Sequence, residues 1–220
     1  MSETEIKDLS IKPEGYYNQV RQEMIEFVPE NARTMLDVGC GEGLFGLHVK
    51  KKYGTEVWGI ELDADSAKNA QKNLDKVLTG DICLLIDSLP DGYFNCIVFN
   101  DVLEHMVDPY SVLIKVKNKL SKNGLIICSI PNFRFFYSLR DFLASKDWKY
   151  EDEGIFDKTH LRFFTLKSIK RMFDSLDYEI LKIKGLSEIR SWKFKLLDLL
   201  SFGYLADTRY VQYACVARPR

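Results

Sequence analysis

Short apolar runs alternate along the chain with segments in which apolar side chains recur every three or four positions. The first kind of segment predicts buried strands, and the second predicts helices with one buried face. Pro29 and Gly54 mark the ends of two of the expected helices. We expect strands at residues 34–38, 56–61, 77–81, 94–100, 124–131, 178–186 and 209–219, and helices at residues 16–28, 43–54, 63–74, 108–120, 166–176 and 191–203.

This alternation predicts an α/β fold. Residues 94–100 and 124–131 are almost continuously apolar, which is typical of strands covered on both faces. Strands that are joined through helices form right-handed βαβ units and a parallel sheet. We therefore expect a Rossmann-like, doubly wound sheet with helices on both faces, in a single domain over residues 1–220 that begins with a helical segment at 1–30.

The alternation breaks between residues 132 and 165. This stretch is irregular and rich in aromatic residues, and it predicts a cap insertion, part helix and part loop, over the active site. We expect its aromatic side chains to pack on the sheet; the alternative is a lid that stacks on a sugar. Residues 190–204 combine basic and apolar side chains, and we expect them to pack against the protein rather than to lie on a membrane surface.

Composition and charge exclude several classes of partner. A formal net charge of −1 over 220 residues gives no global positive field for nucleic acid or an anionic membrane. The five cysteines are scattered without a C-x-x-C pair, which predicts buried thiols in a reducing compartment. The N-terminus has no apolar signal core, and no run approaches the ~20 apolar residues of a membrane span. We expect a cytoplasmic protein without stable membrane insertion.

A glycine-rich turn follows the first expected strand. Residues 41–46 fit the dinucleotide pattern G-x-G-x-x-G, and Glu61 follows at the distance expected of a ribose-binding acid. This pattern alone does not separate nicotinamide cofactors from other adenosine ligands. Asp37 stands at the exit of the strand, where a carboxylate ~5 Å from a pyrophosphate costs a few kcal/mol. We therefore favour a cationic ligand, S-adenosylmethionine; the competing interpretation of Asp37 is a turn or helix cap.

Acidic residues also stand at the ends of the next three expected strands. Glu61 ends the second strand, Asp81 follows the third, and Asp101 and Glu104 follow the fourth. In an open α/β sheet, ligands bind at the carboxyl ends of the strands. Glu61 is expected to hold both ribose hydroxyls, and Asp81 to accept from the adenine amine with the Ile82 backbone beside the ring.

The sequence resembles class I S-adenosylmethionine-dependent methyltransferases over about residues 15–135. The resemblance is most specific to small-molecule methyltransferases with a D-V-L-E-H motif after the fourth strand. Residues 131–165 also resemble methyltransferases of bacterial surface-polysaccharide assembly, where a D-x-T-H-L-R-F-F-T run recurs. The matching stretches are LDVGCGEG (36–43), GIELD (59–63), GDI (80–82), FNCIVFNDVLEHMVDP (94–109) and LIICSIPN (125–132).

This resemblance implies a seven-stranded, mostly parallel sheet whose last strand, residues 209–219, is antiparallel. It also implies a cofactor site for S-adenosylmethionine, with S-adenosylhomocysteine as the product. Asp37, Gly39 and Gly41 would line the methionine end, and Tyr17 would close over it. Asn100 would lie near the sulfonium and the ribose. The full set of predicted cofactor-binding residues is Tyr17, Asp37, Gly39, Gly41, Glu61, Leu62, Asp81, Ile82 and Asn100.

Methyl transfer to a hydroxyl needs alignment of the acceptor oxygen and a way to remove its proton. His105 and His160 are the predicted catalytic residues. The competing interpretations are a residue behind the adenosine pocket for His105 and a tie between cap and core for His160. Arg162 and Tyr137 are the predicted substrate-binding residues. The histidines lack the spacing of metal ligands, so we expect no metal site.

The sequence thus predicts a methyltransferase acting on a small-molecule or glycan acceptor, with O-methylation favoured. Two other functions stay open: a nicotinamide-dependent oxidoreductase on a similar fold, and a non-catalytic module that binds S-adenosylmethionine. No nucleic-acid partner is expected, because the N/D-P-P-Y/F motif of exocyclic amine methylation is missing after the fourth strand. A homodimer is compatible with the sequence.

Overall fold

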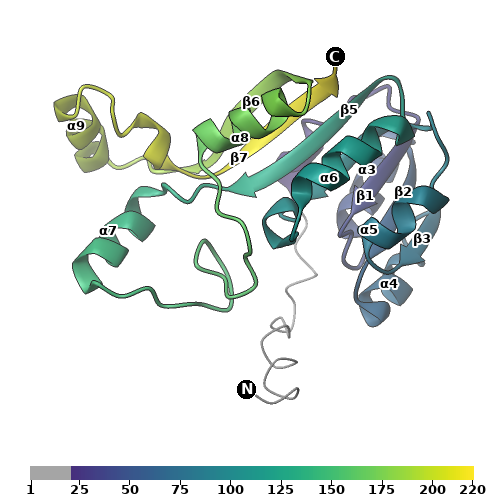
Figure 1. The fold of residues 1–220 in the computed structure, drawn as a ribbon, viewed down its shortest axis with the longest axis horizontal. Coiled ribbons are helices and arrows are strands. Elements are labelled where there is room, and N and C mark those ends of the chain that lie inside the picture. Colours follow the sequence, from purple (N-terminus) through teal and green to yellow (C-terminus); the bar gives the residue numbers. More distant parts are fainter. Residues whose placement is uncertain (1–20) are drawn as a thin grey trace.

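A computed structural model of the protein describes residues 21–220. These residues form a seven-stranded sheet in the order β3-β2-β1-β4-β5-β7-β6 (Figure 1). All neighbouring strands from β3 to β5 are parallel, and β7 is antiparallel to both β5 and β6. The predicted fold class is confirmed. The strands are β1 (Thr34–Val38), β2 (Glu56–Glu61), β3 (Lys76–Thr79), β4 (Phe94–Asn100), β5 (Leu120–Pro131), β6 (Tyr178–Glu188) and β7 (Tyr210–Pro219).

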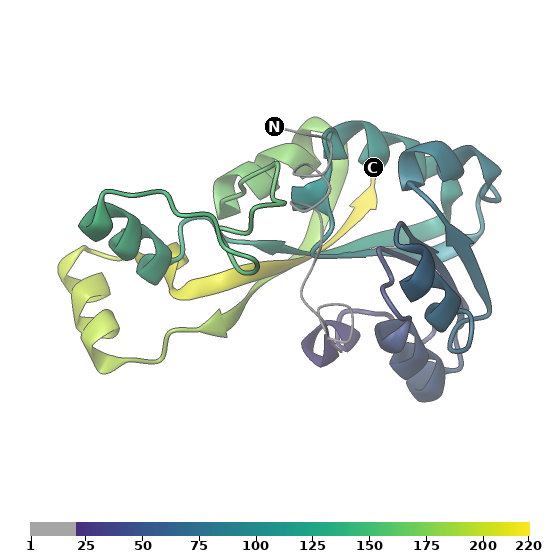
Figure 2. The same ribbon diagram turned by 90° about the horizontal axis from the view of Figure 1, so that it is seen from below.

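Helices cover both faces of the sheet, as Figure 2 shows with the sheet seen from below. Alternate strand residues point to opposite faces, so that Met35 of β1 belongs to one hydrophobic cluster and Leu36 to the other. The strand residues of both clusters are buried, so the central strands are covered on both faces. This explains why their sequences are almost continuously apolar. One face carries α2 (Gln22–Ile25), α3 (Leu44–Tyr53) and α4 (Ala64–Ala70), and the other carries α5 (Ile82–Leu85), α6 (Pro109–Lys115) and α8 (Leu166–Ser175).

Side-chain caps fix where several helices begin. Asp63 accepts from the Ser66 N–H at 2.8 Å at the start of α4, and Thr165 forms a capping box with Ser168 at the start of α8. The helix expected over residues 16–28 is shorter in its described part, because only Gln22–Ile25 is helical. The buried Phe27 and Val28 follow it in a turn.

The two remaining helices lie together beyond the end of the sheet (Figures 1 and 2). Helices α7 (Phe136–Ser145) and α9 (Trp192–Leu200) meet through Phe136 and Phe194, whose ring centroids are 5.2 Å apart. The expectation that residues 190–204 pack against the protein is wrong for most of α9, because Phe194 is its only buried residue. Leu199, Leu200 and Phe202 are exposed.

The cysteines follow the sequence interpretation. All five are free, and four of them are buried, while Cys83 is exposed. Within residues 21–220, none of the helices has the length and apolar character needed to cross a membrane.

Candidate active site

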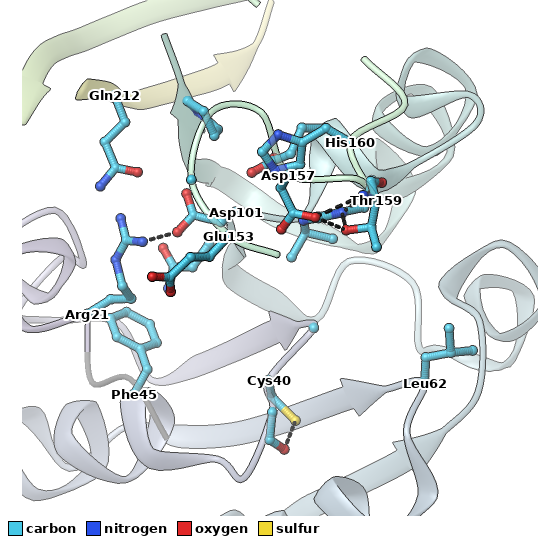
Figure 3. A pocket seen from close by; sticks show the side chains of 18 of the residues that line it. Arg21, Cys40, Phe45, Leu62, Asp101, Glu153, Asp157, Thr159, His160 and Gln212 are labelled. Carbon is cyan, nitrogen blue, oxygen red and sulfur yellow. Dashed lines mark hydrogen bonds and ion pairs between the residues drawn. The ribbon is translucent and has the colours of Figure 1, made fainter. Parts of the chain in front are cut away.

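A cavity of about 1060 Å³ opens at the carboxyl ends of the central strands (Figure 3). This is the edge at which ligands bind in open α/β sheets. Its volume is at the upper end of the range for small-molecule sites, which leaves room for a cofactor and an acceptor together. Its walls come from the turn after β1, the ends of β2 and β4, the loop at residues 151–160, and Gln212 of β7.

The turn after β1 is held close to its neighbours by backbone hydrogen bonds. The Gly39 and Cys40 N–H groups both donate to the Ile60 carbonyl, at 2.8 and 3.1 Å. Gly39 has a φ of +69°, and a Cβ atom there would lie 2.7 Å from Val102 Cγ2. A side chain at this position would therefore be both strained and in collision with Val102, two residues after the end of β4.

Glu61 is fixed at the rim of this turn. Its carboxylate accepts from the Gly41 N–H at 2.8 Å and from the Asp63 N–H at 3.0 Å. Glu61 is 5% exposed, and its two oxygens each keep further lone pairs for a ligand. The carboxylate thus has a set position at the end of β2, where the sequence placed the ribose.

Asp37 and Asn100 carry polar atoms that the protein leaves without partners. Asp37 is 2% exposed, and its Oδ2 accepts no hydrogen bond. Both side-chain atoms of Asn100 are likewise buried and unbonded. Burial, together with the negative charge of Glu61, raises the pKa of Asp37 to about 8. Buried polar groups in this state are explained by a ligand that supplies the missing bonds, and a cationic, hydroxyl-bearing nucleoside such as S-adenosylmethionine fits them.

The exit of β4 is tied to the N-terminal part of the described chain. Ser129 Oγ donates to Asp101 Oδ1 at 2.9 Å, and Arg21 makes an ion pair with Asp101. Figure 3 shows Arg21 pointing at Asp101, and the side chain of Gln212 pointing toward the same part of the cavity. Asp101 has a φ of +54°, so the chain bends sharply here before the short helix at Leu103–His105.

Two imidazoles meet at the loop of residues 151–160. The ring centroids of His105 and His160 are 4.7 Å apart, with an angle of 62° between the rings. Nδ1 of His105 lies 3.1 Å from the Thr159 carbonyl oxygen, and Nδ1 of His160 lies 3.2 Å from the Ile155 carbonyl oxygen. A carbonyl only accepts, so each Nδ1 carries a proton and donates it.

Backbone and side-chain bonds hold this loop against the exit of β4. The Leu161 and Arg162 N–H groups both donate to the Glu104 carbonyl, at 2.8 and 3.0 Å. Within the loop, the Thr159 hydroxyl donates to Asp157 Oδ1 at 2.8 Å, and Asp157 is 1% exposed. His160 is therefore positioned by the same contacts that fold the loop.

The aromatic residues of the segment at 132–165 pack largely on one another. Trp148 stacks on Phe133 at 5.4 Å and meets Phe142, Phe156 and Phe163 edge-on at 4.8 to 5.6 Å. This small core supports the loop from behind, and none of these five aromatic residues lines the cavity.

The structure brings most of the predicted site residues to one cavity. Asp81 instead caps α5, where it accepts from the Cys83 N–H at 2.8 Å. Tyr137 lies on α7, and Arg162 donates to the Val107 carbonyl outside the cavity wall. Ile82 is buried outside that wall, and Tyr17 lies outside the described residues. The predicted residues that line the cavity are Asp37, Gly39, Gly41, Glu61, Leu62, Asn100, His105 and His160.

Sequence reasoning missed several residues of the cavity wall. Arg21 and Gln212 come from distant parts of the chain, and no local pattern marks them. Glu153 and Thr159 lie in the irregular segment beside His160, and their nearness to that histidine was the available signal.

Comparison with known proteins gives a family match over most of the chain. The family model described as a methyltransferase domain matches residues 14–183. Among curated proteins, the chain is 28% identical over 147 residues to a mitochondrial ubiquinone biosynthesis O-methyltransferase of Candida albicans, covering 62% of this chain and 43% of that protein. It is 37% identical over 101 residues to an ajmaline N-methyltransferase of Rauvolfia serpentina, covering 43% of this chain and 35% of that protein.

Solved structures share the fold over nearly the whole chain. A SAM-dependent methyltransferase from Archaeoglobus fulgidus has a TM-score of 0.68 at 22% identity, covering 98% of this chain and 99% of that one. The plantazolicin methyltransferase BpumL, solved with SAH, has a TM-score of 0.62 at 18% identity, covering 100% of this chain and 92% of that one. In the curated relatives described above, by contrast, the match spans less than half of their length.

Proposed function

We propose that this chain, which belongs to the family of methyltransferase domains, transfers a methyl group from S-adenosylmethionine to an oxygen atom of a small-molecule or sugar acceptor. The observation that carries the choice of cofactor is Asp37. Its Oδ2 is buried without a partner in a cavity whose other polar atoms suit a nucleoside. A sulfonium or ammonium group favours the ionised form of this carboxyl and can displace its proton, whereas a diphosphate disfavours ionisation and gains no ion pair, which argues against the nicotinamide alternative.

The cofactor-binding residues of this proposal lie at the ends of four strands, β1 to β4. Asp37 and the turn at Gly39–Gly41 take the methionine end, Glu61 takes the ribose hydroxyls, and Asn100 bonds between them. Asp81 and Ile82 take the adenine at the start of α5, just outside the cavity wall. Each of these assignments follows the order of the strands in the sheet, in which β1 lies between β2 and β4.

The acceptor end of the site is the imidazole pair. A hydroxyl must lose its proton in the transfer, whereas a neutral amine attacks with a lone pair already available. Two imidazoles beside the Glu104 carboxyl are suited to the first task. This supports O-methylation, although the curated relatives include both an O- and an N-methyltransferase.

The bond changes are those of an in-line displacement. Bound S-adenosylmethionine supplies an electrophilic methyl group on its sulfonium sulfur. The acceptor oxygen would form a bond to the methyl carbon while the carbon–sulfur bond breaks with its electron pair going to sulfur, and one of the two imidazoles would take the acceptor proton. The protein aligns the two reactants. The loop of residues 151–160 forms one wall of the site and keeps water away from them.

The acceptor class and the location of the protein are also proposals. The similarity of residues 131–165 to methyltransferases of bacterial surface-polysaccharide assembly supports a sugar acceptor, and Arg162 and Tyr137 would lie toward its outer part. Five free cysteines support a reducing, cytoplasmic setting.

Two measurements test this function. Isothermal titration calorimetry should detect binding of S-adenosylmethionine and of S-adenosylhomocysteine but not of NAD. A coupled assay for S-adenosylhomocysteine release, run over phenols, catechols and nucleotide sugars, should give turnover that falls at least 10-fold in His160→Ala with unchanged cofactor affinity. His48→Ala is the matched control, because His48 lies on α3 outside the cavity wall. Binding of NAD in place of the sulfonium compound would refute the proposal.

A further inference from the structure

Three side chains at the acceptor end of the cavity have the composition of a metal site. One carboxylate oxygen of Glu104 and one ring nitrogen each from His105 and His160 lie within 4.8 Å of one another. A metal ion with bonds of about 2.0 to 2.2 Å separates neighbouring ligand atoms by about 3 to 3.6 Å. The three atoms would have to approach one another by up to about 1 Å to share one ion, a change that side-chain rotation can supply.

These side chains are held in place by the backbone around them. Glu104 and His105 belong to the short helix at Leu103–His105, and Glu104 is 1% exposed. The Glu104 carbonyl receives the Leu161 and Arg162 N–H groups, which fixes the segment after His160 against this helix. Residues far apart in the sequence are therefore joined rigidly, as the ligands of a preformed metal site must be.

Both imidazoles are oriented as metal-binding histidines are. Metal-bound histidines donate their other ring N–H to a backbone carbonyl or a carboxylate, which fixes the tautomer. Here, Nδ1 of His105 donates to the Thr159 carbonyl, and Nδ1 of His160 donates to the Ile155 carbonyl. The Thr159 hydroxyl lies 3.0 Å from His105 Nδ1 and donates its proton to Asp157, so it can only accept from the ring. Coordination of a metal ion through the Nε2 atoms would keep both of these hydrogen bonds.

We propose that Glu104, His105 and His160 bind a divalent transition-metal ion. Two imidazoles and one carboxylate favour Mn²⁺, Fe²⁺, Co²⁺ or Zn²⁺ over Mg²⁺ and Ca²⁺, which prefer all-oxygen ligands. A set of three protein ligands leaves positions for water or substrate. Asp101 lies at the same strand exit, but its oxygens are engaged by Ser129 and Arg21. The sequence predicted no metal site, because the spacing of the histidines gave no sign that they meet.

The metal site deepens the proposed function and, in its catalytic role, rests on it. An ion at this place lowers the pKa of an acceptor hydroxyl that it binds. The hydroxyl proton is then lost to solvent water before or during the attack on the methyl carbon. With the ion bound, His105 and His160 act as ligands, and the ion replaces their role as proton acceptors. The binding site itself does not depend on which acceptor is used.

Binding is tested with Mn²⁺ alone, on protein treated with EDTA and freed of it, without cofactor or acceptor. Electron paramagnetic resonance should show one Mn²⁺ bound per chain, with ¹⁴N coupling from imidazole in the pulsed spectrum. His160→Ala and Glu104→Gln should each weaken Mn²⁺ binding at least 10-fold, and His48→Ala should leave it unchanged. Circular dichroism melting checks that the variants fold; Glu104→Gln keeps the shape of the buried side chain.

Several outcomes would overturn the site. They are the lack of Mn²⁺ binding at millimolar concentration, binding without ¹⁴N coupling, and equal binding by the wild type and both folded variants. Calorimetry with S-adenosylmethionine in EDTA separates this proposal from the function. Cofactor binding and full turnover in EDTA would overturn the metal's catalytic role and leave the methyltransferase intact. Mn²⁺ binding without any cofactor binding would support the site and refute the proposed function.

Discussion

Replacing Asp37 by Asn should stabilise the cofactor-free fold while weakening cofactor binding. The pKa of Asp37 is raised to about 8 by burial, first of all, and by the charge of Glu61. At neutral pH the folded protein therefore keeps a proton on Asp37, whereas the unfolded chain, with a pKa of about 3.9, has lost it. This ionisation lowers the free energy of the unfolded state, and Asn removes that effect without changing the shape of the side chain.

The magnitude follows from the separation of the two pKa values. Between pH 4 and pH 8 the folded state holds one more proton than the unfolded state, so the free energy of unfolding falls by up to about 1.4 kcal/mol per pH unit as the pH rises. At pH 7 the accumulated loss in the free energy of unfolding is roughly 4 kcal/mol. Asn removes this loss, but its buried amide without a partner costs about 1 to 3 kcal/mol of stability. A net gain of ~2 kcal/mol for Asp37→Asn corresponds to about 4 to 8 °C in melting temperature.

Urea unfolding of both proteins at pH 5, 6, 7 and 8 measures this difference directly. The advantage of Asp37→Asn should grow with pH up to about 8 and then level off, since other titrating groups cancel in the comparison. Asp63→Asn is the control: a hydrogen bond from the Ser66 backbone lowers the pKa of Asp63, so its effect should be constant over this range. An advantage of Asp37→Asn that does not change with pH would refute the assignment of a protonated, buried carboxyl.

Three shorter predictions concern the same site and its surroundings. A cation bound beside Asp37 lowers the pKa of this carboxyl, so binding of S-adenosylmethionine at pH 7 should release up to one proton. Calorimetry in buffers of different ionisation enthalpy measures this release. A binding heat that is the same in all buffers would contradict the prediction. Gly39→Ala should weaken cofactor binding at least 10-fold, because its Cβ would lie 2.7 Å from Val102 Cγ2. Gly54→Ala, with a φ of +71° and no atom within 4 Å of the new Cβ, should lose some stability but no affinity. In native thiol titration with Ellman's reagent, one equivalent per chain should react rapidly, at the exposed Cys83; two rapid equivalents would show that a buried thiol opens.

The cofactor half of the site was predictable because it is built from strand ends. Hydrophobic periodicity locates β1, β2 and β4, and parallel pairing brings their carboxyl ends to one edge. The residue that leaves each strand then has a known place. Asp37 and Glu61 could be assigned to one cavity from these rules, and the family resemblance added Asn100; the structure brings all three there.

The other half depends on contacts that leave no periodic signal. Gln212 lies on the antiparallel β7, and its position against the cavity depends on the crossover that inserts this strand between β5 and β6. His160 is placed by bonds from its neighbours to the Glu104 carbonyl, which any residue type can make. The exposed apolar side chains of α9 are a third case, because amphipathic spacing predicts a helix but does not say what covers it.

Two buried carboxyls in one cavity raise the question of whether one cation or two belong there. Burial raises the pKa of Asp37 and so keeps it protonated, and no imidazole is among the contacts described for it. Glu104 lies with His105 and His160, a set that suits a metal ion. If a single cation served both carboxyls, Asp37→Asn would abolish Mn²⁺ binding. If there are two sites, Asp37→Asn should leave Mn²⁺ bound and lose only the sulfonium ligand, and Glu104→Gln should do the reverse. The different chemistry of the two surroundings favours the second result.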